Sequence, residues 1–206
     1  WNTEDFKRLF AQDIPKQELM LFQLLSVTGF RLEEGAAIEW QDIKTNDNGV
    51  YYFDLHGLNK ILKTEQAMRN FPIHHKLIPL LNAYGEAVGR TGRLFEYPKD
   101  KDGKCNRTAV KALSPYLKVA RHENGKEVKH IKTHGLRGTF TSACYKVGMP
   151  DSMRRFIGGW KQQGEDQAYL EPDLDRENEM LQKIDFVHIG HDRNEPITDK
   201  KVWGSL

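Results

Sequence analysis

The 206-residue sequence lacks the features that define several protein classes. It has only two cysteines, Cys105 and Cys144, and no C-x-x-C pair, which excludes a disulfide framework and a cysteine-based zinc site and predicts a reducing cytosol. No apolar run approaches the ~20 residues needed to cross a bilayer, and no signal-peptide pattern opens the chain. Because the sequence begins at Trp1 without an initiator methionine, we expect a piece of a longer protein.

A large net charge is also lacking, because 31 Lys and Arg residues nearly balance 29 Asp and Glu residues. The charge is nevertheless unevenly spread: it is −4 over residues 1–50, +9 over 101–155 and −5 over 161–180. Such a basic stretch indicates either a surface for a polyanion or a solvated face that other parts of the fold balance. With 38% hydrophobic residues, the chain has enough apolar material for a core.

Apolar residues recur mostly at helical spacing, so a mainly helical chain is expected. Its length fits one large domain or two very small ones. Gly29, Gly148 and the pair Gly158-Gly159 follow three of the expected helices and supply their C-terminal stops. The expected helices cover residues 13–28, 32–40, 76–88, 106–123, 133–147, 151–158 and 173–183.

One small sheet is expected beside the helices. The aromatic and β-branched run Val50–Leu55 predicts a strand, which the turn residues Asn46–Gly49 precede. Further strands are expected at Ile61–Thr64 and Arg69–Ile73, and the basic stretch Arg121–Lys132 predicts a loop or a short hairpin. The expected fold class is therefore α+β, mainly α-helical with one small antiparallel three-stranded sheet.

The segment Thr133–Phe140 holds the first candidate for chemistry. If Thr133 caps the helix, His134 and Arg137 lie three residues apart on one face of its first turn, ~5–6 Å apart at Cβ. Unpaired backbone N–H groups and the positive end of the helix dipole favour an anion at this position. The pattern predicts a phosphate site, and the alternative is a surface histidine beside a solvated arginine.

Three sequence boxes follow one another along the chain. Thr28–Glu34 reads T-G-F-R-L-E-E and runs into the apolar stretch Ala36–Ile43 with its tryptophan. His134–Phe140 reads H-G-L-R-G-T-F, and Trp160 stands nine residues before Tyr169. This set resembles the tyrosine recombinase (phage integrase) family over nearly the whole chain, with tryptophan in the third box where the family more often has histidine.

The resemblance implies the domain layout. Residues 1–183 match the C-terminal catalytic domain of the family, residues 184–206 form a C-terminal tail, and the N-terminal core-binding domain is absent from this sequence. The tail contains Phe186, Val187, Ile189 and Trp203, which suggest a partner. Members of the family pack such a tail onto a neighbouring subunit, and the alternative is that it folds back on its own domain.

The resemblance also implies that six side chains cleave a DNA strand. Tyr169 would attack phosphorus and form a covalent 3′-phosphotyrosine link. The two clamp arginines, Arg31 and Arg137, would hold the non-bridging oxygens of the phosphate. His134 would accept the tyrosine proton or hydrogen-bond the phosphate. Trp160 would donate one hydrogen bond and pack the site.

The sixth implied residue is the lysine of the β-hairpin that follows the first box. Lys63 is assigned to this position because Lys63-Thr64 is followed by the R-x-x-P segment Arg69–Pro72, and Lys60 is the fallback. This lysine would protonate the departing 5′ oxygen. The hairpin turn lacks the glycine that the family usually has there.

The implied function is site-specific DNA recombination by the integrase of a phage or another mobile element, with no cofactor and no metal. The implied partner is double-stranded DNA, on which a homotetramer would exchange tails, and no membrane is involved. The expected location is the cytoplasm of a prokaryotic host, at the nucleoid. Structural or surface roles are expected for the four histidines that lack partners at ligand spacing, His74, His75, His188 and His191.

Three other interpretations remain open. The same pocket chemistry would serve a type IB topoisomerase, which relaxes supercoils without recombining DNA. A non-catalytic DNA-binding homologue would need the basic stretch but no nucleophile. An interaction domain would carry the basic stretch incidentally, and it would bind no DNA even at low salt.

Overall fold

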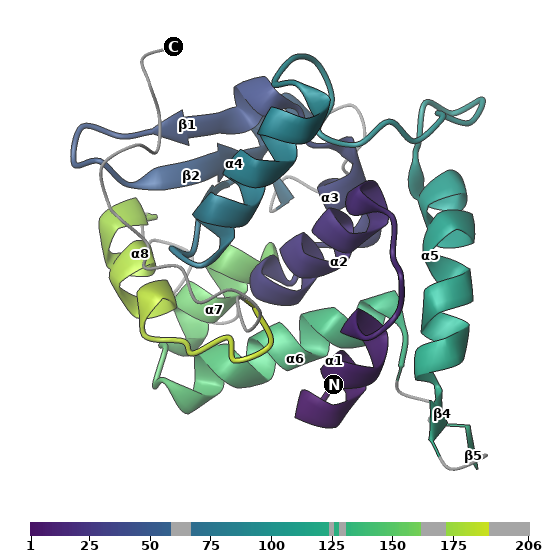
Figure 1. Cartoon of the computed structure of the whole chain (residues 1–206). Helices are drawn as coiled ribbons and strands as arrows, with labels where there is room; N and C mark the ends of the chain where they lie inside the picture. The colour runs from purple at the N-terminus through teal and green to yellow at the C-terminus, as the bar shows by residue number, and fades with distance from the viewer. Residues whose placement is uncertain (59–66, 124–125, 128–130, 162–171, 190–206) are drawn as a thin grey trace.

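Helices pack against a three-stranded antiparallel sheet, which confirms the expected α+β class (Figure 1). The computed structural model describes residues 1–58, 67–123, 126–127, 131–161 and 172–189. The helices are α1 (Thr3–Phe10), α2 (Lys16–Thr28), α3 (Leu32–Ala37), α4 (Leu77–Val88), α5 (Asn106–Ala120), α6 (Thr133–Lys146), α7 (Asp151–Gly158) and α8 (Leu174–Gln182). The strands are β1 (Ile43–Thr45), β2 (Tyr51–Asp54), β3 (Asn70–Pro72), β4 (His122–Glu123) and β5 (Lys126–Glu127). Within these ranges, no helix has both the length and the apolarity to span a bilayer.

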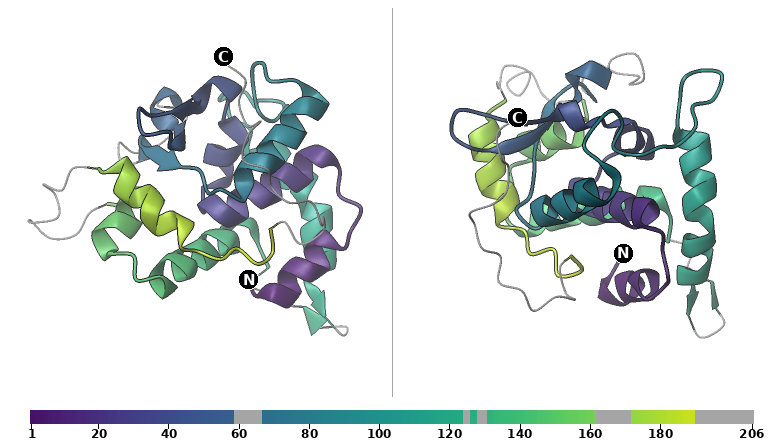
Figure 2. Two further views of the ribbon diagram at one scale, coloured as in Figure 1. Left: turned by 60° about the vertical axis from the view of Figure 1, so that its left-hand side comes forward. Right: turned by 45° about the horizontal axis from the view of Figure 1, so that its top comes forward.

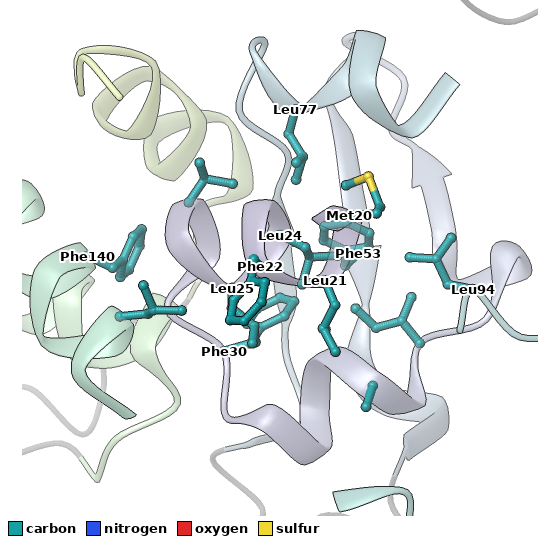
Figure 3. Close-up of a cluster of buried hydrophobic side chains, with 14 of the residues drawn as sticks. Met20, Leu21, Phe22, Leu24, Leu25, Phe30, Phe53, Leu77, Leu94 and Phe140 are labelled. Carbon is teal, nitrogen blue, oxygen red and sulfur yellow. The ribbon is translucent and has the colours of Figure 1, made fainter. Parts of the chain in front are cut away.

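Helix α2 is the element around which the core is built. It contacts α3, α4 and α6, and Figure 3 shows its apolar side chains among residues from the sheet, α4 and α6. From Met20 to Thr28 every residue of α2 except Gln23 is buried, and a helix segment covered in this way is apolar on nearly all its faces rather than amphipathic. The buried hydroxyls of Ser26 and Thr28 donate to carbonyls one turn back, so α2 buries no unsatisfied hydroxyl. The buried apolar residues of α2 are Met20, Leu21, Phe22, Leu24, Leu25 and Val27.

The sheet has the strand order β1-β2-β3, and both pairs are antiparallel. Phe53 of β2 lies opposite Ile43 of β1 and Phe71 of β3. The sequence does not predict β1, because three residues between the 3-10 turn Trp40–Asp42 and the next turn are too few to show alternation. The strand expected at residues 61–64 lies outside the described part of the chain.

Four phenylalanines connect the sheet to the first two sequence boxes. Phe30, between α2 and α3, meets Phe53 and Phe71 edge-on, with ring centroids 5.8 and 4.7 Å away. The ring of Phe71 in turn lies 5.9 Å from that of Phe140 on α6. All four rings are buried, and offset or edge contacts of this kind add specificity to apolar burial. They fix the α2–α3 junction against α6.

Helix α1 was not among the expected helices, although the sequence carries its start signal. Asn2 Oδ1 accepts the backbone N–H of Asp5, and the carboxylate of Asp5 accepts the N–H of Asn2. Such a reciprocal pair satisfies two otherwise unpaired donors at a helix start. Helix α1 packs against α5, which runs along one side of the molecule (Figures 1 and 2). After α5, strands β4 and β5 confirm the short-hairpin interpretation.

The first residues of the C-terminal tail pack on their own domain. Phe186 and Ile189 are buried, and the His188 ring stacks on Phe6 of α1 with a centroid separation of 3.7 Å. Nε2 of His188 lies 3.0 Å from Oγ of Ser26. For residues 184–189, therefore, the chain takes the fold-back alternative.

The end of α2 yields a matched stability test at two glycines. Gly29 has φ 62°, and a Cβ there would lie 2.6 Å from Cδ1 of Phe140; Gly49 has φ 79° and nothing within 4 Å. Alanine in the left-handed region lowers the free energy of unfolding by about 1–2 kcal/mol at either position. Gly29→Ala in addition overpacks the core against Phe140, which lowers the free energy of unfolding by about 1–3 kcal/mol more. Urea unfolding should therefore show a larger loss for Gly29→Ala, and equal losses would contradict the tight contact with Phe140.

The tail contact predicts a pH dependence of stability. Burial, aided by the charges of Lys76 and the N-terminus, lowers the pKa of His188 from 6.5 to about 4. Between these values the unfolded chain binds more protons at this residue, so His188 lowers stability as the pH falls, by up to about 1 kcal/mol per pH unit. His188→Phe should remove part of the stability loss between pH 6.5 and 4 and leave stability at pH 8 nearly unchanged. An unchanged acid slope in urea unfolding would show that His188 is not buried in its neutral form.

Candidate active site

The first box places Arg31 at the junction of α2 and α3. Its backbone N–H donates to Oε2 of Glu34 at 2.9 Å, and its guanidinium donates to Oε1 of the same carboxylate at 2.6 Å. Glu34 is fully buried, whereas the Arg31 side chain is 44% exposed. The carboxylate therefore caps the start of α3 and holds the guanidinium at the edge of the core, partly open to solvent.

The second box forms the first turn of α6. The helix begins at Thr133 itself and the capping position is Lys132, so the expected cap at Thr133 is wrong by one residue. His134 is exposed, whereas Arg137 is buried. The two side chains share this turn as expected, but they lie at different depths.

Arg137 joins the C-terminal ends of two helices. Nη1 donates to the carbonyl of Gly29 at 2.8 Å, and Nη2 donates to the carbonyl of Gly158. The guanidinium also lies over the Trp160 ring, 4.6 Å from the centroid. Burial lowers the pKa of Arg137 to about 10, and the charge of Glu34 opposes this shift, so the group is a cation at neutral pH.

The third box places Trp160 beside Arg137 through the geometry of two glycines. Gly159 ends α7 with φ 63°, and the backbone N–H of Trp160 then donates to the carbonyl of Arg155 at 2.8 Å. The indole lies flat against Gly158, where a Cβ would come within 2.5 Å of the ring. The Gly-Gly-Trp order of this box is thus required by the close approach of the indole to the backbone.

Arg31 and His134 line one surface pocket, together with the edges of α3, α5 and α6. The pocket has a volume of about 270 Å³. This volume is smaller than the roughly 300–1,000 Å³ of pockets that enclose whole small molecules. The pocket could instead receive one chemical group of a larger molecule that binds across the surface. The pocket is lined by Phe30, Arg31, Leu32, Glu33, Asn106, Thr133 and His134.

A buried cation that the sequence analysis left without a role lies next to this site. Arg69 precedes β3, is 2% exposed, and places Nη2 3.6 Å from Oε2 of Glu34. Burial lowers the pKa of Arg69, and the Glu34 carboxylate opposes that shift. The sequence contains a signal for the burial of Arg69. Ala67, Phe71 and Ile73 stand at two-residue intervals from Arg69, as residues on one face of a strand do, and the structure buries all of them.

The remaining predicted residues fall outside the described chain. Tyr169 lies in 162–171, and Lys63 and its fallback Lys60 lie in 59–66. The structure therefore places four of the six predicted side chains, and it brings Arg137 into contact with Trp160 and Arg31 and His134 into one pocket.

Helix α8, which begins five residues after Tyr169, is anchored on the sheet side of the domain. Asp175 accepts bonds from Asn46 at 2.8 Å and Asn48 at 2.5 Å, both in the β1–β2 turn. Glu177 is buried, and burial raises its pKa to about 8 while the charge of Arg69 opposes the shift. Burial therefore favours the protonated form of Glu177.

Metal-ligand geometry is not found in the part of the chain that the structure describes, where no group of three His, Cys, Asp or Glu side chains could hold an ion. Nε2 of His74 lies 3.0 Å from the carbonyl of Ile184, and Nδ1 of His75 lies 2.7 Å from Oε1 of Gln182. These histidines bond protein groups, as expected of structural residues. His191 lies outside the described residues.

Two comparisons with known proteins found a match. The model of the phage integrase family matches residues 3–176. Among solved structures, the fold is similar to an integrase from mycobacterium phage Brujita, with a TM-score of 0.58 and 16% identity. The match covers 88% of this chain and 56% of that one, so the chain spans a little over half the length of that integrase. No curated protein matches the sequence.

The buried carboxylate makes a prediction about stability. Glu34→Gln leaves Arg69 and Arg31 facing a neutral amide, and breaking a buried ion pair from one side costs about 3–5 kcal/mol. Glu4→Gln is the matched control, because Glu4 pairs with Lys7 at 2.8 Å on the exposed surface, where such pairs contribute about 0–1 kcal/mol. Urea unfolding of both variants measures the difference. Similar small losses would show that Glu34 does not compensate the buried cations.

Proposed function

The chain belongs to the phage integrase family, and we propose that it cleaves and rejoins double-stranded DNA at specific sites through a covalent 3′-phosphotyrosine intermediate. The observation that carries this proposal is the convergence of three distant sequence boxes. Arg137 of the second box bonds the carbonyl of Gly29 in the first box and stacks on Trp160 of the third. A DNA-binding module without turnover needs no such assembly.

The two clamp arginines have the chemistry that a phosphodiester requires. The ester resists attack because its negative charge repels nucleophiles and its leaving alkoxide is poor. Guanidinium groups stay charged and bond phosphate oxygens in fixed geometry, so Arg31 and Arg137 would neutralise the non-bridging oxygens as charge develops in the transition state. Arg137 is preorganised by its two carbonyl bonds, and Arg31 by Glu34.

The remaining steps are proton transfers and one exchange at phosphorus. The Tyr169 oxygen would attack phosphorus, the bond to the 5′ oxygen would break, and a 3′-phosphotyrosyl ester would form. His134 would accept the tyrosine proton or bond the phosphate, and Lys63 would give a proton to the departing 5′ oxygen. Trp160 would donate one hydrogen bond and exclude water. A 5′-hydroxyl from a second strand would reverse these steps without ATP, because the link keeps the energy of the ester.

Duplex DNA has a basic surface to bind beside the pocket. Asn106, the first residue of α5, lines the pocket, and the exposed cations Arg107, Lys111 and Lys118 follow at i, i+4 and i+11 along one stripe of the helix. Contacts between such cations and backbone phosphates release counterions and weaken as salt rises. The basic stretch of the sequence would in this way place the scissile phosphate over Arg31 and His134.

The assembly that we propose on DNA is a homotetramer whose subunits exchange tails, in the cytoplasm of a prokaryotic host at the nucleoid. Because residues 184–189 pack on their own domain, the exchange would involve the residues after Ile189. The apolar Trp203 in that part of the sequence would be one contact to the neighbouring subunit.

Covalent capture tests the function directly. The chain is mixed with a randomised pool of nicked duplexes, in which cleavage near the nick lets the short product diffuse away and traps the protein on DNA. We expect an adduct that survives denaturing electrophoresis and is absent with Tyr169→Phe, because a phenyl ring has no nucleophile. Tyr145→Phe is the control, since Tyr145 is 71% exposed on α6, and it should form the adduct normally.

Each other result points to one of the alternatives. An adduct that persists with Tyr169→Phe would refute the assigned nucleophile. Gel shifts without any adduct would indicate a non-catalytic DNA-binding homologue. Relaxation of supercoiled plasmid without strand exchange would indicate a topoisomerase.

A further inference from the structure

Arg69 is a buried charged side chain that contacts Glu34, the partner of Arg31, and the end of α7, which bonds Arg137. Its Nε donates to the carbonyl of Ile157 at 2.6 Å, and Nη1 donates to the carbonyl of Ala67 at 2.8 Å. Nη2 makes no hydrogen bond among the described residues but lies 3.6 Å from Oε2 of Glu34. The guanidinium also lies 5.4 Å from the centre of the Phe30 ring.

On one side Arg69 acts on Arg31 through a shared carboxylate. Oε2 of Glu34 accepts the backbone N–H of Arg31 and faces Arg69, while Oε1 accepts from the Arg31 guanidinium. The position of the carboxylate between the two cations therefore decides where Arg31 lies.

On the other side Arg69 acts on Arg137 through the end of α7. Ile157, whose carbonyl binds Arg69, directly precedes Gly158, whose carbonyl binds Arg137. The same turn leads into Trp160, which stacks on Arg137. A shift of this helix end would move both the Arg137 partner and the indole.

We propose that Arg69 is a positioning residue for strand cleavage, which aligns Arg31 through Glu34 and Arg137 through the C-terminal end of α7. The inference rests on the proposed function, because it assigns a role in that reaction. Arg69 is 2% exposed and is held by buried partners, so it acts through the clamp arginines rather than on DNA.

The position needs the shape of arginine as well as its charge. A guanidinium presents five N–H groups in a rigid plane and serves Ile157, Ala67 and Glu34 in three directions at once. A lysine would keep a buried cation opposite Glu34, but a single ammonium would not hold all three partners in the same geometry. Arg69→Lys should therefore preserve more of the stability than of the cleavage rate.

The test uses the duplex that the unchanged chain captures from the randomised nicked pool. Single-turnover cleavage is measured at saturating DNA for Arg69→Lys and Arg69→Met, and thermal unfolding shows that each variant is folded. A misplacement of about 1 Å in a catalytic group can lower a rate about 10²-fold, so we expect Arg69→Met to cleave about 10²-fold more slowly. Affinity, measured with Tyr169→Phe as the background, should change little.

A second substrate separates positioning from a general structural role. In the same duplex, a methylphosphonate at the cleaved position replaces one charged non-bridging oxygen by a methyl group. The clamp arginines then have no negative charge to neutralise at that oxygen. The factor by which Arg69→Met slows cleavage should be at least about tenfold smaller on this substrate. The reason is that the lost interaction is one made to the charge that develops on the phosphate oxygen. A variant that is merely loosened would be equally slow on both substrates.

Arg93→Met is the matched control. Arg93 is half-buried and donates to the carbonyl of Tyr97 and to Sγ of Cys105, both at 2.7 Å, rather than to Glu34 or to the end of α7. Its loss should affect both substrates equally. If Arg69→Met behaves like Arg93→Met, or if Arg69→Lys cleaves at the full rate, the positioning role is overturned while the proposed function stands. If the unchanged chain captures no duplex, the proposed function fails, and this inference fails with it.

Discussion

One buried carboxylate makes the charge arrangement of this domain possible. Glu34 has no exposed surface, and its oxygens face the cations Arg31 and Arg69, while its charge also acts on Arg137. Removing a guanidinium from water costs several kcal/mol unless an opposite charge and hydrogen bonds replace the solvent. Glu34 supplies that charge from α3, whereas the arginines come from the α2–α3 junction, the start of β3 and α6. The carboxylate therefore links the first box to the start of β3 and, through its charge, to Arg137 of the second box.

Helix C-termini stabilise the buried arginines as well. The last carbonyls of a helix have no intrahelical partner and form the negative end of its dipole. Arg137 bonds such carbonyls at the ends of α2 and α7, and Arg69 bonds the carbonyl one residue earlier in α7. The glycines at these ends, Gly29 and Gly158, have no side chain that would block Phe140 or Trp160. Backbone geometry and charge compensation thus come from the same few residues.

Much of the fold could be predicted from sequence because its signals are local. Helix stops such as Gly29 and the aromatic and β-branched run that forms β2 depend on neighbouring residues, and such signals predict most of the helices and strands β2 and β3. The missing parts depend on tertiary contact. Burial of Arg137 beside the exposed His134 depends on its contact with Gly29 at the end of α2, which lies 108 residues away in sequence, and the short strand β1 is recognised by its pairing with β2. Arg69 stands at two-residue intervals from apolar residues, which indicates the buried face of a strand. No local rule, however, predicts which backbone carbonyls its guanidinium bonds.

The buried cluster around Glu34 carries more positive than negative charge. Among the described residues, Arg31, Arg69 and Arg137 face the one carboxylate of Glu34 in this cluster, whereas Glu33 adds a further carboxylate to the lining of the pocket beside Arg31. Arg31 and Arg69 both lower the pKa of Arg137, which is the signature of mutual repulsion between the cations. An anion placed between Arg31 and Arg137 would relieve that repulsion. In the proposed reaction, the buried positive charge that makes the core depend on Glu34 would also stabilise the negative charge that develops on the phosphate oxygens.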